Sequence, residues 1–145
     1  MPASYEALHT DATSSRCGAG SPSGPIGPPS LYGLPIGYKI LPDADPAEVT
    51  AVTYAIAQLG KPYVWGGAGP DVFDCSGLTM AAWAKAGVSL FHSSNDQFYE
   101  GRAATIRTGD LVLVPGSDGT LANRGHVGIY IGYGLVLSAV DPRYG

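Results

Sequence analysis

The first regular pattern of apolar positions along the chain has a helical period and begins just after residue 45. Asp45 is suited to cap a helix, Pro46 fits its first turn, and Glu48 stands where a capping box places an acid. The sequence therefore predicts a helix that begins after Asp45 and ends at Gly60. Its apolar face is expected to hold Val49, Val52, Ala55, Ile56 and Leu59.

Two more helices are predicted further along the chain. Residues 61–73 (KPYVWGGAGPDVF) are too rich in Gly and Pro for a helix, but a helical apolar stripe follows from Cys75 to Lys85, with Gly87 as its stop. Ser94 followed by Gln97 indicates the start of a third, short helix. The stripe of the second helix is formed by Leu78, Ala82, Trp83 and Ala86.

After Gly101 the apolar pattern changes from a helical period to short β-branched runs. Three runs, at 111–115, 126–132 and 135–140, are separated by Gly-rich turns and predict consecutive antiparallel strands. Helices followed by strands indicate an α+β domain in which the N-terminal helices pack on one small antiparallel sheet.

Residues 1–30 lack such a pattern, whereas apolar residues alternate in 31–42 (LYGLPIGYKILP), which is expected to lie over the domain surface as an arm. Residues 18–30 (GAGSPSGPIGPPS) contain 11 Gly, Pro or Ser in 13 positions and bury too little apolar surface to offset the entropy of ordering. The sequence therefore predicts a linker or surface arm at 1–45 and one domain at 46–145.

Composition excludes several classes of protein. Charged residues make up 14% of the chain, too few for a coiled coil, and hydrophobic residues make up 45%, too many for a wholly disordered chain. Eight Lys and Arg and a net charge of −4 argue against nucleic-acid binding. No apolar run is long enough to span a bilayer, and no signal peptide is visible.

Cys75 is the first candidate for chemistry, because it follows Asp74 at a predicted helix start. A helix N-terminus carries about half a positive charge and is expected to favour the thiolate. Ser76 and Gly77 leave the thiol uncrowded and offer a backbone N–H to a developing oxyanion. The alternative is a small buried core cysteine, and the residues alone leave the two interpretations evenly matched.

His126 is the second candidate. It opens a predicted strand between Gly125 and Gly128, where an imidazole has room to reach a neighbouring element. A thiol and an imidazole on different elements that meet is the arrangement of a cysteine peptidase. The other candidates for a base are His9 in the N-terminal arm and His92 before the third helix, and the alternative for His126 is a partly exposed strand-end residue.

A metal site would also explain a cysteine and a histidine. It needs three or four ligands, and no third Cys or closely spaced His accompanies Cys75 and His126. Cys17 lies 58 residues from Cys75 and the two form neither a disulfide scaffold nor a zinc cluster by spacing. We therefore expect neither a metal nor an organic cofactor.

Four blocks of the sequence closely resemble the NlpC/P60 family of cell-wall peptidases, in the usual order and spacing. They are 60–90 (GKPYVWGGAGPDVFDCSGLTMAAWAKAGVSL), Ser94 with Gln97, 109–112 (GDLV) and 125–132 (GHVGIYIG). The resemblance covers about residues 46–140. It implies a papain-like α+β fold, a bacterial origin and cleavage of peptidoglycan stem peptides, most often between D-glutamate, through its γ-carboxyl, and a diamino acid.

The resemblance also implies roles for single residues. Cys75 would be the nucleophile and His126 the general base, and Tyr63 would line the site and support the oxyanion. The position of the third catalytic residue, usually a histidine, falls on Ser138, which is shorter and uncharged. Substrate contacts are expected from Asp74, Ser76, Trp65 and His92.

Three departures from the family pattern accompany these roles. Ser138 would orient the His126 imidazole only weakly, and Asp141 could take its place only if the strand bends. His92 stands where the family has an arginine. The chain ends at Gly145, a few residues after the third strand, so we expect a domain that is short at its C-terminus.

Three functions remain open at this stage. The first is a peptidoglycan endopeptidase, secreted or associated with the cell wall and monomeric. The second is a weak or inactive NlpC/P60 module that binds the cell wall or a partner. The third is a related thiol enzyme, such as an amidase or acyltransferase, that acts on another amide or ester.

Overall fold

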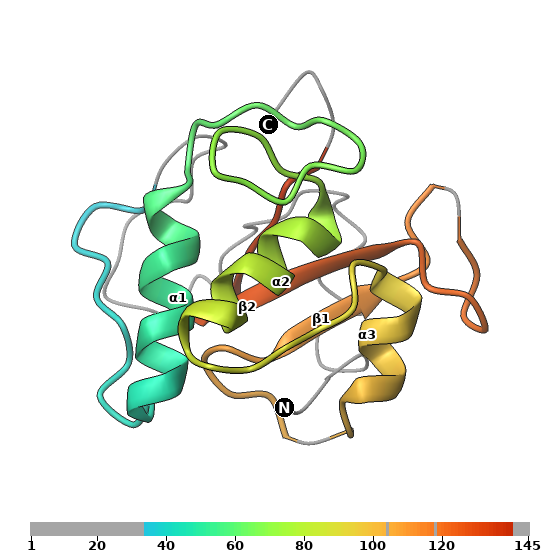
Figure 1. Ribbon diagram of the computed structural model, residues 1–145. Coiled ribbons are helices and arrows are strands. Elements are labelled where there is room, and N and C mark those ends of the chain that lie inside the picture. The colour runs from blue at the N-terminus through green and yellow to red at the C-terminus, as the bar shows by residue number, and fades with distance from the viewer. Residues whose placement is uncertain (1–33, 104, 118, 141–145) are drawn as a thin grey trace.

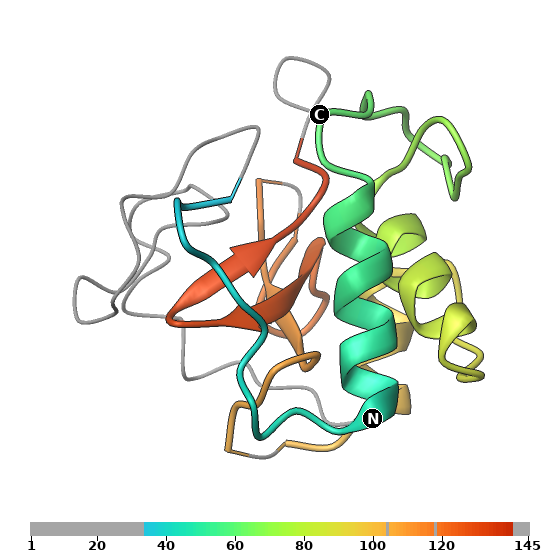
Figure 2. The same cartoon turned by 90° about the vertical axis from the view of Figure 1, so that its left-hand side faces the viewer.

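The computed structural model describes residues 34–140 apart from 104 and 118. Three helices, α1 (Pro46–Ala57), α2 (Cys75–Lys85) and α3 (Ser94–Glu100), precede three strands, β1 (Leu111–Val114), β2 (His126–Gly132) and β3 (Leu135–Leu137). The strands form an antiparallel sheet in the order β1-β2-β3. The helices lie together on one face of this sheet, which gives two layers (Figures 1 and 2). The predicted α+β fold is confirmed.

Helix α1 begins with the predicted capping box. The Asp45 carboxylate accepts a hydrogen bond from the backbone N–H of Glu48 at 3.0 Å, and the Glu48 carboxylate accepts one from the N–H of Asp45 at 2.8 Å. Val52 and Ala55 are buried as expected. Val49 is 37% exposed, so its place on the apolar face was predicted wrongly; Ala51, one helical turn from Ala55, is buried instead.

Helix α2 has the predicted bounds and forms the centre of the helical layer. Asp74 is its N-cap, and Leu78, Ala82 and Trp83 are buried on the stripe that faces the core. The indole N–H of Trp83 donates to the Gly109 carbonyl at 3.1 Å, which fixes the ring against the segment before β1. Apolar packing and the hydrogen bond of Trp83 therefore hold α2 over the sheet.

Helix α3 begins at Ser94, as predicted, but the residue that caps it is the one before. Its N-cap is Ser93, whose hydroxyl accepts from the N–H of Asp96 at 3.3 Å, whereas Ser94 is already helical. Gln97 does not complete a capping box; it is fully buried. Ser94 and Gln97 therefore marked the start of the helix correctly, but they do not form a capping box.

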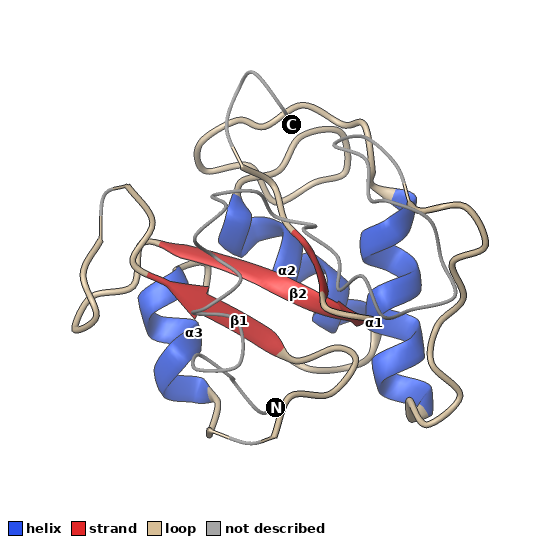
Figure 3. Cartoon of the chain, turned by 180° about the vertical axis from the view of Figure 1, so that it is seen from behind, coloured by secondary structure: helices blue, strands red, loops and turns tan. Residues whose placement is uncertain are grey.

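The sheet, seen from behind in Figure 3, provides eight of the sixteen buried hydrophobic residues in the described part of the chain. Leu111, Leu113, Val127 and Ile129 are fully buried on β1 and β2. The third strand is shorter than the predicted run of 135–140, because ladder pairing ends at Leu137.

Residues 34–45 pack beside the β2–β3 turn. The Tyr38 hydroxyl donates to the Ile131 carbonyl at 2.6 Å, and its ring meets that of Tyr133 edge to face, with centroids 6.0 Å apart. The domain boundary at residue 45 stays a prediction, and the Gly- and Pro-rich stretch at 18–30 lies outside the described residues.

Candidate active site

Cys75 is the first residue of α2, and its partly exposed thiol lies against the start of β2. Burial raises the pKa of the Cys75 thiol, although the backbone N–H of Val127 lowers it; the Asp74 carboxylate raises it further. The N–H of Ser76 also favours the thiolate, as expected at a helix start. Burial outweighs these N–H groups, so the predicted preference for the thiolate is wrong for the resting site.

His126 is the first residue of β2 and pairs with Val114 in the ladder. Burial lowers the pKa of the imidazole from 6.5 to about 4, so the ring is neutral at neutral pH. The close position of Gly116 gives the ring space, because a Cβ at Gly116 would lie 3.0 Å from the His126 Cβ. A neutral imidazole can accept a proton.

Ser138 lies directly after β3, and its side chain contacts the imidazole of His126. Its Oγ is 3.1 Å from Nε2 of His126. Gly128 makes this approach possible, because a Cβ at that position would lie 2.4 Å from Val136 and 3.2 Å from the Ser138 Cβ. The candidate triad thus draws one residue from each of α2, β2 and the end of β3.

Asp74 connects three segments around the thiol. Its Oδ1 accepts hydrogen bonds from the N–H of Gly77 at 2.6 Å and from the Ser76 hydroxyl at 3.3 Å. The same oxygen lies 2.8 Å from Nε2 of His92, and Oδ2 accepts from the N–H of Gly66 at 2.8 Å. Asp74 and Ser76 are both buried. These contacts hold the loops around the start of α2 together, and contact of Asp74, Ser76 and His92 with substrate stays a prediction.

Tyr63 and Trp65 differ in exposure, although residues two apart in an extended segment would share a face; Tyr63 forms a β-bridge, whereas Trp65 already lies in a turn. Tyr63 is half-buried, packs against the core and forms a bridge with Phe73. Trp65 is 86% exposed. A contact with substrate is therefore open to the Trp65 ring.

Two residues near the site were not identified from the sequence. Gln97 bonds to the first turn of α2, and Arg124, two residues before His126, is held by α3. Gln97 was named in a helix-start motif and in the family resemblance, but no role in the site was assigned to it. No local signal marks Arg124, because its partners lie 29 and 30 residues away.

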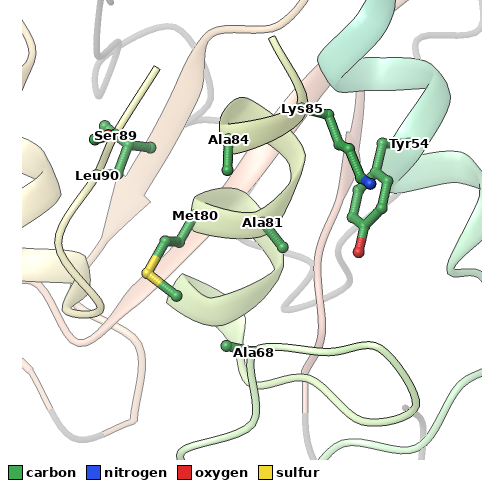
Figure 4. Close-up of a pocket in the computed structure, with 8 residues that line it drawn as sticks. All are labelled: Tyr54, Ala68, Met80, Ala81, Ala84, Lys85, Ser89 and Leu90. Carbon is green, nitrogen blue, oxygen red and sulfur yellow. The ribbon is translucent and has the colours of Figure 1, made fainter. Parts of the chain in front are cut away.

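A cavity of about 580 Å³ lies away from these residues, along the outer side of α2 (Figure 4). Met80, Ala81 and Ala84 of α2 line it, and Tyr54 of α1 and Ala68 contribute to its walls. None of the candidate site residues lines this cavity. It is separate from the thiol chemistry.

Within the described residues, no group of three or more His, Cys, Asp or Glu is placed to hold a metal ion. In the same part of the chain, no helix has the length and apolar character needed to cross a membrane. His9, Cys17 and Asp141, considered in the sequence analysis, lie outside the described residues.

Comparison with known proteins identifies close similarity in sequence and fold. Residues 60–143 match the NlpC/P60 family. A protein of Mycobacterium bovis named "probable endopeptidase" is 41% identical over 123 residues, which cover 83% of this chain and 30% of that protein. The chain therefore spans about a third of the length of this relative.

Two solved structures from Mycobacterium tuberculosis share the fold. The peptidoglycan hydrolase RipB has a TM-score of 0.55 and 33% identity, covering 68% of this chain and 55% of that one. RipD, described as a non-catalytic NlpC/p60 domain protein adapted to a peptidoglycan-binding function, has a TM-score of 0.57 and 29% identity, covering 68% of this chain and 85% of that one.

Proposed function

The chain belongs to the NlpC/P60 family, and we propose that it is a cysteine endopeptidase that hydrolyses peptidoglycan stem peptides. The observation that carries the proposal is the meeting of Cys75, at the start of α2, with the start of β2, where His126 contacts Ser138. The naming of the Mycobacterium bovis relative as an endopeptidase supports the reaction type. The naming of RipB as a peptidoglycan hydrolase supports the substrate class.

The reaction begins with transfer of the Cys75 proton to His126. Since Nε2 of His126 faces Ser138, Nδ1 is the ring nitrogen that takes the proton. The thiolate sulfur attacks the carbonyl carbon of the scissile amide, and the carbonyl oxygen gains the negative charge. Backbone N–H groups around Cys75, with the Tyr63 hydroxyl, stabilise that oxyanion.

The tetrahedral intermediate then breaks down. Protonated His126 donates its proton to the amide nitrogen, the carbon–nitrogen bond breaks and the amine leaves. Water, deprotonated by the neutral His126, attacks the thioester and restores the thiol. Ser138 keeps the imidazole oriented through these steps, more weakly than a charged or larger partner would.

The proposed bond is the one between the γ-carboxyl of D-glutamate and a diamino acid. The proposed place of action is the cell wall, reached by secretion, and the proposed active form is a monomer. Exposed Trp65 provides a surface for the stem peptide next to the Asp74 segment.

Digestion of purified muropeptides tests the proposal. Wild type should release products whose masses place the cut at the D-glutamyl–diamino acid bond, and Cys75→Ala should release none. Ser138→His should raise turnover if the third position lacks only a stronger orienting group. Identical product profiles for wild type and Cys75→Ala would overturn the endopeptidase proposal.

A second candidate is a module that binds peptidoglycan without cleaving it. The observation that favours it is the small, uncharged Ser138 beside His126, together with the non-catalytic character of RipD. In that case wild type and Cys75→Ala would sediment equally with purified cell walls and leave muropeptides intact.

A further inference from the structure

We infer that α3 sets the relative position of Cys75 and His126 by holding the start of α2 and the approach to β2 at the same time. Figure 1 shows α3 beside the paired ends of β1 and β2. Residues 91–100 bond to both of the segments that carry the proposed nucleophile and base. The inference rests on the proposed function and adds positioning residues to it.

The contact with α2 is made by Gln97, whose side chain is fully buried. Its amide N–H₂ donates to the Ser76 carbonyl at 2.9 Å and to the Phe91 carbonyl at 2.8 Å. Its carbonyl accepts from the Thr79 hydroxyl at 2.7 Å. Two of these partners lie in α2, one of them directly after Cys75, so Gln97 ties the first turns of that helix to α3.

The contact with the approach to β2 converges on Arg124. The Ser94 hydroxyl donates to the Arg124 carbonyl at 2.7 Å, and the Asn95 side-chain oxygen accepts from the Arg124 N–H at 3.1 Å. The Arg124 guanidinium carbon lies 3.5 Å from the centre of the Phe98 ring. Three residues of α3 thus fix both backbone groups and the side chain of one residue.

Arg124 is separated from His126 by Gly125 alone. A glycine adds backbone freedom, so the direction in which His126 enters the strand depends on how its neighbours are held. Gly125 donates to the Pro115 carbonyl at 3.0 Å, and Arg124 is held by α3. Since a misplacement of about 1 Å can cost roughly a hundredfold in rate, the α3 contacts bear directly on proton transfer.

Asn95 offers a clean pair of substitutions. Asn95→Ala removes the acceptor for the Arg124 N–H, whereas Asn95→Asp keeps an oxygen at that place. With muropeptides, Asn95→Ala should lower kcat about tenfold with KM within about twofold of wild type, and Asn95→Asp should restore most of kcat. An unchanged kcat in Asn95→Ala, or a loss that Asn95→Asp does not restore, would overturn the inference.

A second readout does not need turnover. In a Cys17→Ser background, where Cys75 is the remaining thiol, the rate of alkylation by iodoacetamide should fall in His126→Ala and, by a similar factor, in Asn95→Ala. If wild type cleaves no muropeptide but alkylation follows this order, the proposed function fails and the positioning inference stands. If alkylation depends on His126 but not on Asn95, the positioning inference fails alone.

Val52→Ala serves as the control for loss of stability, because Val52 is fully buried in α1. It should lower Tm while kcat, measured well below Tm, and the alkylation rate stay near wild type. If Asn95→Ala does not fold, Ser94→Ala and Ser94→Thr replace the pair, since only the second keeps the hydroxyl that binds the Arg124 carbonyl. Equal kcat in these two variants would contradict the inference.

Discussion

At the scale of single residues, the state of the proposed catalytic pair follows from burial. Burial raises the pKa of the Cys75 thiol and lowers that of the His126 imidazole to about 4. Burial disfavours the charged form of each group, so the pair rests as thiol and neutral imidazole. Transfer of the proton is therefore part of the reaction and is not completed in the resting enzyme.

The pH dependence of Cys75 alkylation tests this resting state. In the Cys17→Ser background the rate should keep rising from pH 6 to pH 9, because the thiol is not ionised below its raised pKa. Activity should fall below about pH 4, where His126 is protonated and cannot accept the proton. The first prediction is measured by the rate of alkylation at each pH, and the second by the pH profile of kcat/KM. A rate that is constant between pH 6 and pH 8 would indicate a preformed thiolate and contradict the prediction.

At the scale of elements, two helices begin with the same chemistry in different surroundings. Asp45 caps α1 and exchanges hydrogen bonds with Glu48. Asp74 caps α2 and also binds Gly66 and His92, which belong to two other segments. One cap therefore serves a helix, and the other also holds the loops around the thiol.

Substitution of the two caps should separate these roles. Asp45→Ala should lower the free energy of unfolding by about 1 kcal/mol and leave kcat near wild type. Asp74→Ala should cost about 2–4 kcal/mol, because it leaves several buried donors without an acceptor, and should lower kcat about tenfold or more. Urea unfolding and muropeptide turnover measure the two effects. Equal kcat in the two variants would refute the proposed difference.

The elements themselves could be predicted because their signals are local. The Asp45 capping box involves only the start of α1, and the apolar stripe involves only α2. Both were found where they were predicted. Two details could not be predicted in this way, because both depend on packing. They are the exposure of the Val49 side chain and the use of Ser93, not the adjacent serine, as the cap of α3. The positioning roles of Gln97 and Arg124 could not be predicted, because their partners are up to 30 residues away and only the fold brings them together.

At the scale of the whole molecule, the candidate site lies where the helical layer meets the sheet. Cys75 comes from α2 and His126 from β2, and the His126 imidazole is a partly buried ionisable group in a chain with few charges. Asp110, just before β1, is buried as well, and burial raises the pKa of its carboxyl to about 6. These two groups couple folding to pH in opposite directions.

The sign of each coupling follows from which state binds the proton. His126 titrates at about 4 when folded and 6.5 when unfolded, so between these values the unfolded chain holds more protons and stability rises with pH. Asp110 titrates at about 6 when folded and 3.8 when unfolded, so the folded chain holds more protons and stability falls as pH rises. Shifts of this size correspond to about 3 kcal/mol each, and they largely cancel in the wild-type protein.

Variants that remove one group should reveal the other. As the pH is raised from 4 to 6.5, the stability of Asp110→Asn relative to wild type should increase by about 2–3 kcal/mol. The reason is that this variant lacks the carboxyl group whose ionisation destabilises the folded wild-type protein. Over the same pH range, the stability of His126→Gln relative to wild type should decrease by a similar amount. The reason is that this variant lacks the imidazole whose deprotonation stabilises the folded wild-type protein. Urea unfolding at half-unit steps of pH gives both differences, and Asp45→Ala, which removes neither buried group, should run parallel to wild type. Curves for Asp110→Asn and His126→Gln that also stay parallel to wild type would show that neither burial is coupled to folding.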